Sequence, residues 1–125
     1  MKRKKILIVD DSKTILMAQR MILGKEPYDL IFASDGEEGI RKALSDKPDL
    51  ILLDVVMPKL TGLDVCRLLR SEEATKDIPI LLVTTRGEGE NVEKGYAAGC
   101  NDYVTKPINS LELLTKVRNY LQAEE

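Results

Sequence analysis

The sequence has 125 residues and contains no histidine. This absence excludes a histidine general base, a histidine metal ligand and a phosphohistidine on this chain. The chain has only two cysteines, Cys66 and Cys100, whose separation matches no metal-ligand spacing. Both are therefore expected to be small core residues. Any nucleophilic or acid–base chemistry must come from Asp, Glu, Lys, Ser, Thr, Tyr or Cys side chains.

Long apolar runs and a strong charge of one sign are also missing. No stretch approaches the roughly 20 apolar residues that span a bilayer, and the basic start leads into an apolar run too short for a signal-peptide core. A net charge of −2 gives no reason to propose nucleic acid or an anionic membrane as a partner. We therefore expect a cytoplasmic protein in which residues 1–125 form one domain.

Five short apolar runs are present, at residues 6–9, 30–33, 50–53, 80–83 and 103–104. The first four are continuous rather than alternating, which is typical of strands buried on both faces of a sheet. Helix-like segments lie between and after them, beginning near residues 12, 35, 61, 88 and 109. This alternation predicts an α/β fold in which right-handed crossovers join a five-stranded parallel sheet covered by helices on both faces.

The last segment carries the clearest helix signals. Asn109 is a good N-cap, and Glu112 stands where a capping-box acid would stand. The side expected to be apolar consists of Leu111, Leu114, Val117 and Leu121. By contrast, three glycines in or near the segment 88–98 predict a weak helix there; they are Gly87, Gly89 and Gly95.

Polar residues follow the apolar runs at the points where the strands should end. Asp10 and Asp11 follow the first run, Asp54 the third, Thr84 the fourth, and Lys106 comes shortly after the fifth. The carboxyl ends of parallel strands share one edge of a sheet, where ligands bind at the reversal of strand order. The pattern therefore predicts three carboxylates, a hydroxyl and an ammonium group in one place.

Such a group of acids has a definite chemistry. Three neighbouring carboxylates repel one another, which raises the pKa of at least one unless a cation relieves the repulsion. Mg²⁺ prefers oxygen ligands and typically takes one or two carboxylates plus a phosphate. A carboxylate can attack phosphorus when a metal and a lysine neutralise the phosphoryl oxygens. Taken singly, each acid could be only a helix cap or turn residue, but the joint pattern favours a functional site.

These residues resemble the receiver domain of bacterial response regulators, the family of the single-domain chemotaxis regulator. The resemblance covers essentially the whole chain. The matching segments are 6–11, 54–58 with 61–62, Thr84 and 106–107. It implies a flavodoxin-like fold with strand order 2-1-3-4-5 and five flanking helices.

The resemblance also implies a role for each matching residue. Asp54 would be the phosphoacceptor. Asp11 would bind Mg²⁺ directly, Asp10 mainly through water, and the backbone carbonyl of Val56 would be a further metal ligand. Asp54 itself would complete the metal site.

The remaining residues of the pattern would bind the phosphoryl group or change position in response to it. Thr84 would bond the phosphoryl group, Lys106 would pair with it, and Lys106–Pro107 would be a cis peptide. Tyr103 would be the aromatic switch residue, whose ring turns inward when Thr84 moves toward the phosphate. A plain, half-buried strand tyrosine remains the alternative for Tyr103.

The family also implies partners. The phosphoryl donor would be a phosphohistidine on a sensor histidine kinase or a histidine phosphotransfer protein. The helix 88–98, the fifth strand and the last helix would then present an altered surface to a downstream target protein. The chain would be no enzyme beyond its own phosphorylation and dephosphorylation.

Two positions affect phosphate lifetime in the family: the residue two after the acceptor and the residue two after the threonine. Here they are Val56 and Arg86. Because the Val56 side chain cannot hydrogen-bond an attacking water, we predict slow self-dephosphorylation.

Three alternative functions would each require a feature that the sequence does not show. An aspartate-nucleophile phosphohydrolase of the haloacid dehalogenase type would need a second acid two residues after its nucleophile, but position 56 is Val. A receiver-fold binding module that is not switched by phosphate would lack the phosphoacceptor, an acid, the threonine or the lysine. None of these is missing from the sequence. A transcription factor would need a helix-turn-helix domain, for which 125 residues ending in the fifth helix are expected to leave no room.

Overall fold

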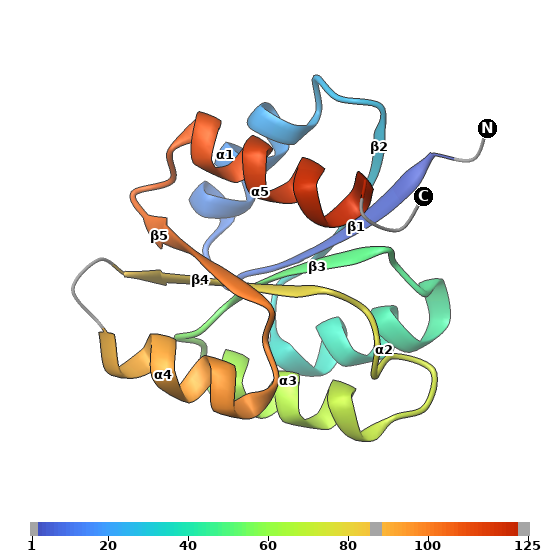
Figure 1. Ribbon diagram of the computed structural model, residues 1–125, viewed down its shortest axis with the longest axis vertical. Helices are drawn as coiled ribbons and strands as arrows, with labels where there is room; N and C mark the ends of the chain where they lie inside the picture. The colour runs from blue at the N-terminus through green and yellow to red at the C-terminus, as the bar shows by residue number, and fades with distance from the viewer. Residues whose placement is uncertain (1–2, 86–88, 123–125) are drawn as a thin grey trace.

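The computed structural model describes residues 3–85 and 89–122, and within them strands and helices alternate along the chain (Figure 1). The elements are β1 Lys4–Val9, α1 Lys13–Leu23, β2 Tyr28–Ala33, α2 Gly36–Asp46, β3 Leu50–Asp54, α3 Gly62–Ser71, β4 Ile80–Thr85, α4 Gly89–Ala98, β5 Asp102–Lys106 and α5 Ser110–Gln122. The alternation predicted from the apolar runs is confirmed.

The five strands form one parallel sheet in the order β2-β1-β3-β4-β5. The resemblance to the receiver family implied this order. β1 pairs with β2 on one side and with β3 on the other, so the strand order reverses at β1. In this register Val9 is paired with Leu53, which places the residues that follow β1 and β3 side by side.

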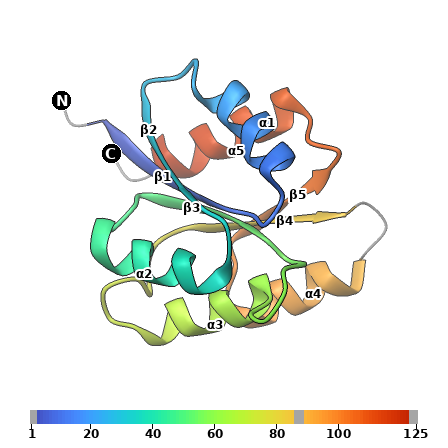
Figure 2. The same cartoon turned by 180° about the vertical axis from the view of Figure 1, so that it is seen from behind.

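Helices cover both faces of the sheet. α1 and α5 pack on one face, and α2, α3 and α4 pack on the other (Figures 1 and 2). Successive residues of β1 supply the two faces in turn: Leu7 and Val9 join one apolar cluster, while Ile6 and Ile8 join the other. This two-sided burial explains the continuous apolar runs, since fully burying each such side chain contributes about 1.5–3 kcal/mol.

Short polar side chains cap several helices. The Ser12 hydroxyl accepts a hydrogen bond from the backbone N–H of Ile15 at 3.3 Å. The Asn109 side-chain oxygen accepts one from the N–H of Glu112 at 3.0 Å, which confirms the predicted N-cap of α5. Each cap satisfies one of the backbone donors that the first turn of a helix leaves free.

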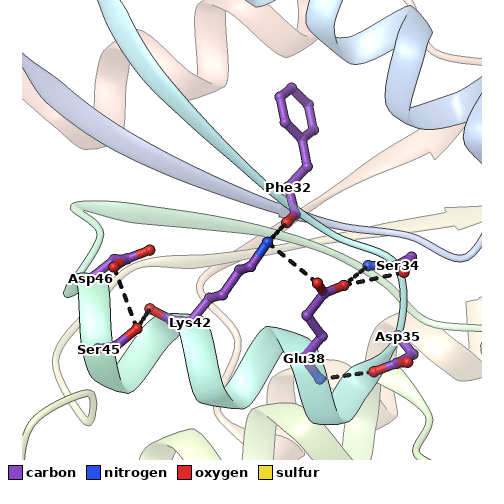
Figure 3. A network of polar contacts seen from close by, with 7 residues as sticks. All are labelled: Phe32, Ser34, Asp35, Glu38, Lys42, Ser45 and Asp46. Carbon is purple, nitrogen blue, oxygen red and sulfur yellow. Dashed lines mark hydrogen bonds and ion pairs between the residues drawn. The ribbon is translucent and has the colours of Figure 1, made fainter.

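A polar network fixes the junction of β2 and α2 (Figure 3). The Glu38 carboxylate accepts hydrogen bonds from the backbone N–H and the hydroxyl of Ser34, at 2.6 Å and 3.1 Å, and Asp35 caps the helix by accepting from the Glu38 N–H. The Lys42 ammonium group donates to the carbonyl of Phe32 and lies 3.3 Å from Glu38. The bond from the Ser34 N–H is the main reason that the pKa of Glu38 is lowered.

One predicted helix face is wrong in part. Leu111 was expected on the apolar side of α5, but it is 74% exposed. The buried residues of α5 are spaced by four, at Leu113, Val117 and Leu121. At about 100° per residue, Leu111 lies roughly 200° around the helix from Leu113 and so faces away from the core.

Gly95, in the segment 88–98, has a packing role that the sequence did not reveal. A Cβ at Gly95 would lie 2.3 Å from the Leu82 side chain and 3.2 Å from the Cys100 sulfur. Glycine at this position therefore lets α4 pack closely on β4.

Cys66 and Cys100 are both buried free thiols, as expected. Over the described ranges 3–85 and 89–122, none of the helices has the length and apolar character needed to cross a membrane.

Candidate functional site

Three carboxylates meet at the carboxyl edge of the sheet. One side-chain oxygen from each of Asp10, Asp11 and Asp54 lies within 4.8 Å of the others. Asp54 is the last residue of β3, and Asp10 and Asp11 directly follow β1, the neighbouring strand. The pairing of β1 with β3 thus brings together acids that are 44 residues apart in the sequence.

Lys106 joins this acidic cluster from the end of β5. Its Nζ lies 3.1 Å from Oδ1 of Asp54 and 3.5 Å from Oδ2 of Asp10. Asp54 and Asp10 are almost completely buried, at 4% and 1% exposed. A single partly buried ammonium group therefore faces two buried carboxylates, and one positive charge does not neutralise both.

The buried acids hold their protons more tightly than usual. Burial, and then the charge of Asp10, raises the pKa of Asp54 to about 6, against the opposing effect of Lys106. Burial also raises the pKa of Asp10. For Lys106, burial alone would lower the pKa, but the hydrogen bond and the charge of Asp54 outweigh it and raise the pKa. The site is thus short of positive charge.

The Asp10 carboxylate is held in place from one side only. Its Oδ1 accepts a hydrogen bond from the backbone N–H of Ser12 at 2.9 Å. Its Oδ2, although 3.5 Å from Lys106, accepts no well-formed hydrogen bond. Because a buried oxygen without a partner is costly, this atom is available for an additional ligand.

Thr84 presents a second buried polar atom to the same edge. It lies in β4, is 3% exposed, and its hydroxyl oxygen has no hydrogen-bond partner within residues 3–85 and 89–122. Asp54 is paired with Val83 in the sheet register, so Thr84 comes one residue beyond the level of Asp54. The hydroxyl is free to donate to a group bound near the acids.

The other described residues named from the sequence lie in or just after β3 and β5. Val56 follows β3 and its side chain is 63% exposed. Tyr103 lies in β5 and contacts Tyr96 and Lys116. The peptide Lys106–Pro107 is cis, as the resemblance implied. Arg86 lies outside the described residues.

The sequence placed residues 61–62 in a matching segment and a helix start near residue 12, but it did not reveal how Gly62 and Ser12 shape the site. A Cβ at Gly62 would lie 2.2 Å from the carbonyl oxygen of Asp54, so only glycine allows α3 to begin directly against the end of β3. The N–H of Ser12 orients Asp10. The spacing of Asp10 and Ser12, in which an Asp bonds the backbone two residues on, could have signalled this turn.

Comparison with known proteins places this geometry in context. The family model described as the response regulator receiver domain matches residues 6–118. The alkaline phosphatase synthesis transcriptional regulatory protein PhoP of Bacillus subtilis is 43% identical over 122 residues, which cover 98% of this chain and 50% of that protein. The chain spans about half the length of the curated relatives it matches.

Solved structures show the same fold. Chemotaxis protein CheY4 of Vibrio cholerae superimposes with a TM-score of 0.90 at 33% identity, over 96% of this chain and 100% of that one. The receiver domain of a sensor histidine kinase from Pseudomonas aeruginosa gives a TM-score of 0.89 at 27% identity, over 97% and 99% of the two chains. That crystal structure holds a magnesium ion coordinated in its active site cleft.

Proposed function

Because the chain belongs to the response regulator receiver domain family of two-component signalling, we propose that Asp54 accepts a phosphoryl group from a phosphohistidine on a partner protein. The observation that supports this most is the pairing of a buried carboxylate, Asp54, with Lys106 at 3.1 Å beside two further acids. Receiver domains are generally signalling modules rather than enzymes. We propose that this one catalyses only its own phosphorylation and dephosphorylation.

The acidic cluster fits a bound Mg²⁺. Its donors are carboxylate oxygens within 4.8 Å of one another, the ligand type that Mg²⁺ prefers. Among the described residues Oδ2 of Asp10 is buried without a hydrogen bond, and the pKa of Asp54 is raised despite Lys106, so the site has less positive charge than its carboxylates need. Asp11 and Asp54 would hold the ion directly, with the backbone carbonyl of Val56, and Asp10 through water. The ion would supply charge that stabilises the phosphoryl oxygens.

The chain's own residues would carry the transfer. An ionised oxygen of Asp54 attacks phosphorus, the bond from phosphorus to the donor imidazole nitrogen breaks, and an acyl phosphate forms. The imidazole nitrogen keeps the bonding electron pair; the imidazole leaves as a neutral group where its other nitrogen already carries a proton, and otherwise takes a proton from solvent. Lys106 pairs with the phosphoryl oxygens, and Thr84 donates its free hydroxyl to one of them.

Phosphorylation would then shift the population of two surface states. We expect Thr84 to move toward the phosphoryl group and the ring of Tyr103 to follow. The surface formed by α4, β5 and α5 would change and control a downstream target protein. Both the donor and this target are proteins; the net charge of −2 favours neither nucleic acid nor a membrane surface. We propose that residues 1–125 act as one cytoplasmic receiver domain.

The decisive experiment is intact-mass spectrometry after incubation with acetyl phosphate and Mg²⁺, with and without chelator. The protein is expected to gain one phosphoryl group only when Mg²⁺ is present. Asp54→Asn, which keeps the size of the side chain, is expected to gain none.

Each of the alternatives predicts a different result. No mass gain under any condition would favour a binding module that phosphate does not switch. Steady hydrolysis of a generic phosphomonoester would favour the phosphohydrolase, although position 56 offers no second acid.

A further inference from the structure

The ring of Tyr103 is contacted from both helices of the proposed output surface. Tyr96 of α4 meets it edge-on, with ring centroids 6.5 Å apart and planes at 87°. Lys116 of α5 places its Nζ 4.7 Å from the centroid of the Tyr103 ring. Both contacts favour one position of the ring, since edge-to-face aromatic pairs and a cation over a ring face are attractive.

The ammonium group of Lys116 is held firmly in that place. It donates to the carbonyl of Tyr103 at 2.5 Å and lies 3.3 Å from Oδ1 of Asp102. With the ring, these contacts occupy the three N–H donors of the group. Asp102 is held in turn by the hydroxyl of Tyr120 at 3.3 Å. The Lys116 side chain is only 25% exposed, so this is an ordered cation rather than a solvated one.

In the ring position seen here, the Tyr103 hydroxyl is not bonded to Thr84, because among the described residues the Thr84 hydroxyl oxygen has no hydrogen-bond partner. The position that phosphorylation is proposed to favour is turned toward Thr84. A ring that turned toward Thr84 would leave the ammonium group of Lys116, which the carbonyl of Tyr103 and the carboxylate of Asp102 keep in place. The attraction between Lys116 and the ring therefore opposes that turn.

We propose that Lys116 is a positioning residue that restrains the Tyr103 ring in the unphosphorylated state and so sets how readily the switch responds. This inference rests on the proposed roles of Thr84 and Tyr103. A cation–ring contact at a partly exposed site changes an equilibrium constant by roughly two- to fivefold. By linkage, a ligand that favours the turned ring binds more tightly by the same factor when the restraint is removed.

The test is NMR of tyrosine-labelled protein, with the Tyr103 ring signals assigned through Tyr103→Phe. The variants are Lys116→Met, which keeps the length without the charge, and Lys116→Arg, which keeps a cation over the ring. Lys76→Met is the matched control, because Lys76 is a surface lysine that forms an exposed ion pair with Glu73. Each protein is titrated with beryllofluoride, a phosphoryl mimic, in the presence of Mg²⁺.

In Lys116→Met, the Tyr103 signals are expected to move toward their beryllofluoride-bound positions before the mimic is added. The apparent affinity for beryllofluoride should increase roughly two- to fivefold. Lys116→Arg should restore both values, and Lys76→Met should match the wild type. If Lys116 had a merely structural role, its loss would not move the Tyr103 signals along the line that joins their free and beryllofluoride-bound positions.

Identical behaviour of Lys116→Met and Lys76→Met would overturn the restraint. If wild-type protein bound no beryllofluoride, the proposed function would fail, while the ring signals of Lys116→Met without the mimic would still decide whether Lys116 positions the ring. If Lys116→Met did not fold, Asp102→Asn would take its place. That variant frees the ammonium group and should shift the signals in the same direction by a smaller amount, and no shift would overturn the proposal.

Discussion

Two polar clusters lie at opposite ends of the sheet, and they differ in how well their atoms are satisfied. At the amino ends of β4 and β5, the guanidinium group of Arg70 donates to the carbonyls of Gly99 and Ile78, at 2.8 Å and 2.7 Å, and to the side-chain oxygen of Asn101 at 2.8 Å. That oxygen also accepts from the N–H of Ile80. This cluster, the Arg70 cluster, joins the end of α3 to the starts of two strands.

At the carboxyl end, the acidic cluster leaves buried atoms without partners. In the part of the chain that the structure describes, neither Oδ2 of Asp10 nor the hydroxyl of Thr84 makes a hydrogen bond, and the pKa of Asp54 is raised to about 6. Buried polar groups are normally satisfied, so the exceptions call for an explanation. The Arg70 cluster, whose polar atoms are hydrogen-bonded, therefore stabilises the fold. The unpaired buried atoms of the acidic cluster instead indicate a site that binds a ligand.

The largest expected effect is on the Arg70 cluster. Arg70→Met leaves three backbone carbonyls (Gly99, Ile78 and Thr75) and Asn101 without a charged donor, which should lower the free energy of unfolding by about 3 kcal/mol. Urea unfolding measures this loss. Arg67→Met is the control, because Arg67 lies on the same helix but makes only an exposed ion pair with Asp64, so its loss should be under about 0.5 kcal/mol. Equal losses for both variants would contradict the assignment of Arg70.

The next effect concerns pH at the acidic cluster. The pKa of Asp54 is about 6 in the folded protein, above the ordinary carboxyl value, so the folded state binds this proton more tightly than the unfolded state. Without divalent cations, Asp54 should therefore lower the free energy of unfolding by roughly 2–3 kcal/mol as the pH rises from about 4 to about 7. Asp10, whose pKa is also raised, acts in the same direction.

The measurement is the difference in unfolding free energy between wild type and Asp54→Asn over this pH range. The variant lacks the titrating group, so its free energy of unfolding should increase relative to that of the wild type as the pH rises. A difference that stays constant from pH 4 to pH 7 would show that Asp54 has an ordinary pKa in the folded protein.

Asp10→Asn is expected to have two smaller effects of opposite sign, one on stability and one on Mg²⁺ binding. Removing one of the two buried like charges should raise the metal-free unfolding free energy by about 1 kcal/mol. The same change should weaken Mg²⁺ binding by about tenfold, measured by calorimetry. Asp77→Asn, at an exposed residue far from the site, should change neither value. Loss of both stability and Mg²⁺ affinity in Asp10→Asn would mean that Asp10 stabilises the fold, as Arg70 does.

The smallest effect is kinetic. Val56 is exposed beside the acidic cluster, and its side chain cannot hydrogen-bond a water that attacks the phosphoryl group. Val56→Asn supplies such a hydrogen bond, which can change the dephosphorylation rate by up to about tenfold. We expect the phosphate half-life to shorten about fivefold. Mass spectrometry over time gives the half-life, and Val56→Leu should leave it unchanged. An unchanged half-life in Val56→Asn would remove our explanation of slow dephosphorylation.

Much of the fold could be predicted because the core is two-sided. Residues such as Ile6 and Leu7 alternate between two apolar clusters, so each strand appears in the sequence as an unbroken apolar run. The strand order could not be derived from that pattern, because several orders bury the same runs; it came from the family resemblance. Leu111 was misplaced because an apolar residue on a helix surface does not by itself reveal which side is buried.

The membership of the acidic cluster was predictable because Asp10, Asp11, Asp54 and Lys106 all follow strands that end at one edge. Their roles in phosphorylation stay predictions. The contact of Lys116 with Tyr103 was not predictable, because it joins two elements at a spacing that no local pattern encodes. The same holds for Gly95, whose missing side chain matters only once α4 lies against Leu82.

The Arg70 cluster also has a mechanical consequence for the output surface. Its bond to the carbonyl of Gly99 ties the carboxyl end of α4 to α3, and the close approach of Gly95 to Leu82 holds that end against β4. Any tilt of α4 must therefore turn about this end as a pivot. Ten residues at 1.5 Å each make a lever about 15 Å long, so a tilt of about 10° displaces the opposite end by about 2.6 Å. The anchored end is the carboxyl end of α4, and the end that travels is its amino end, which follows the strand that contains Thr84 in the sequence.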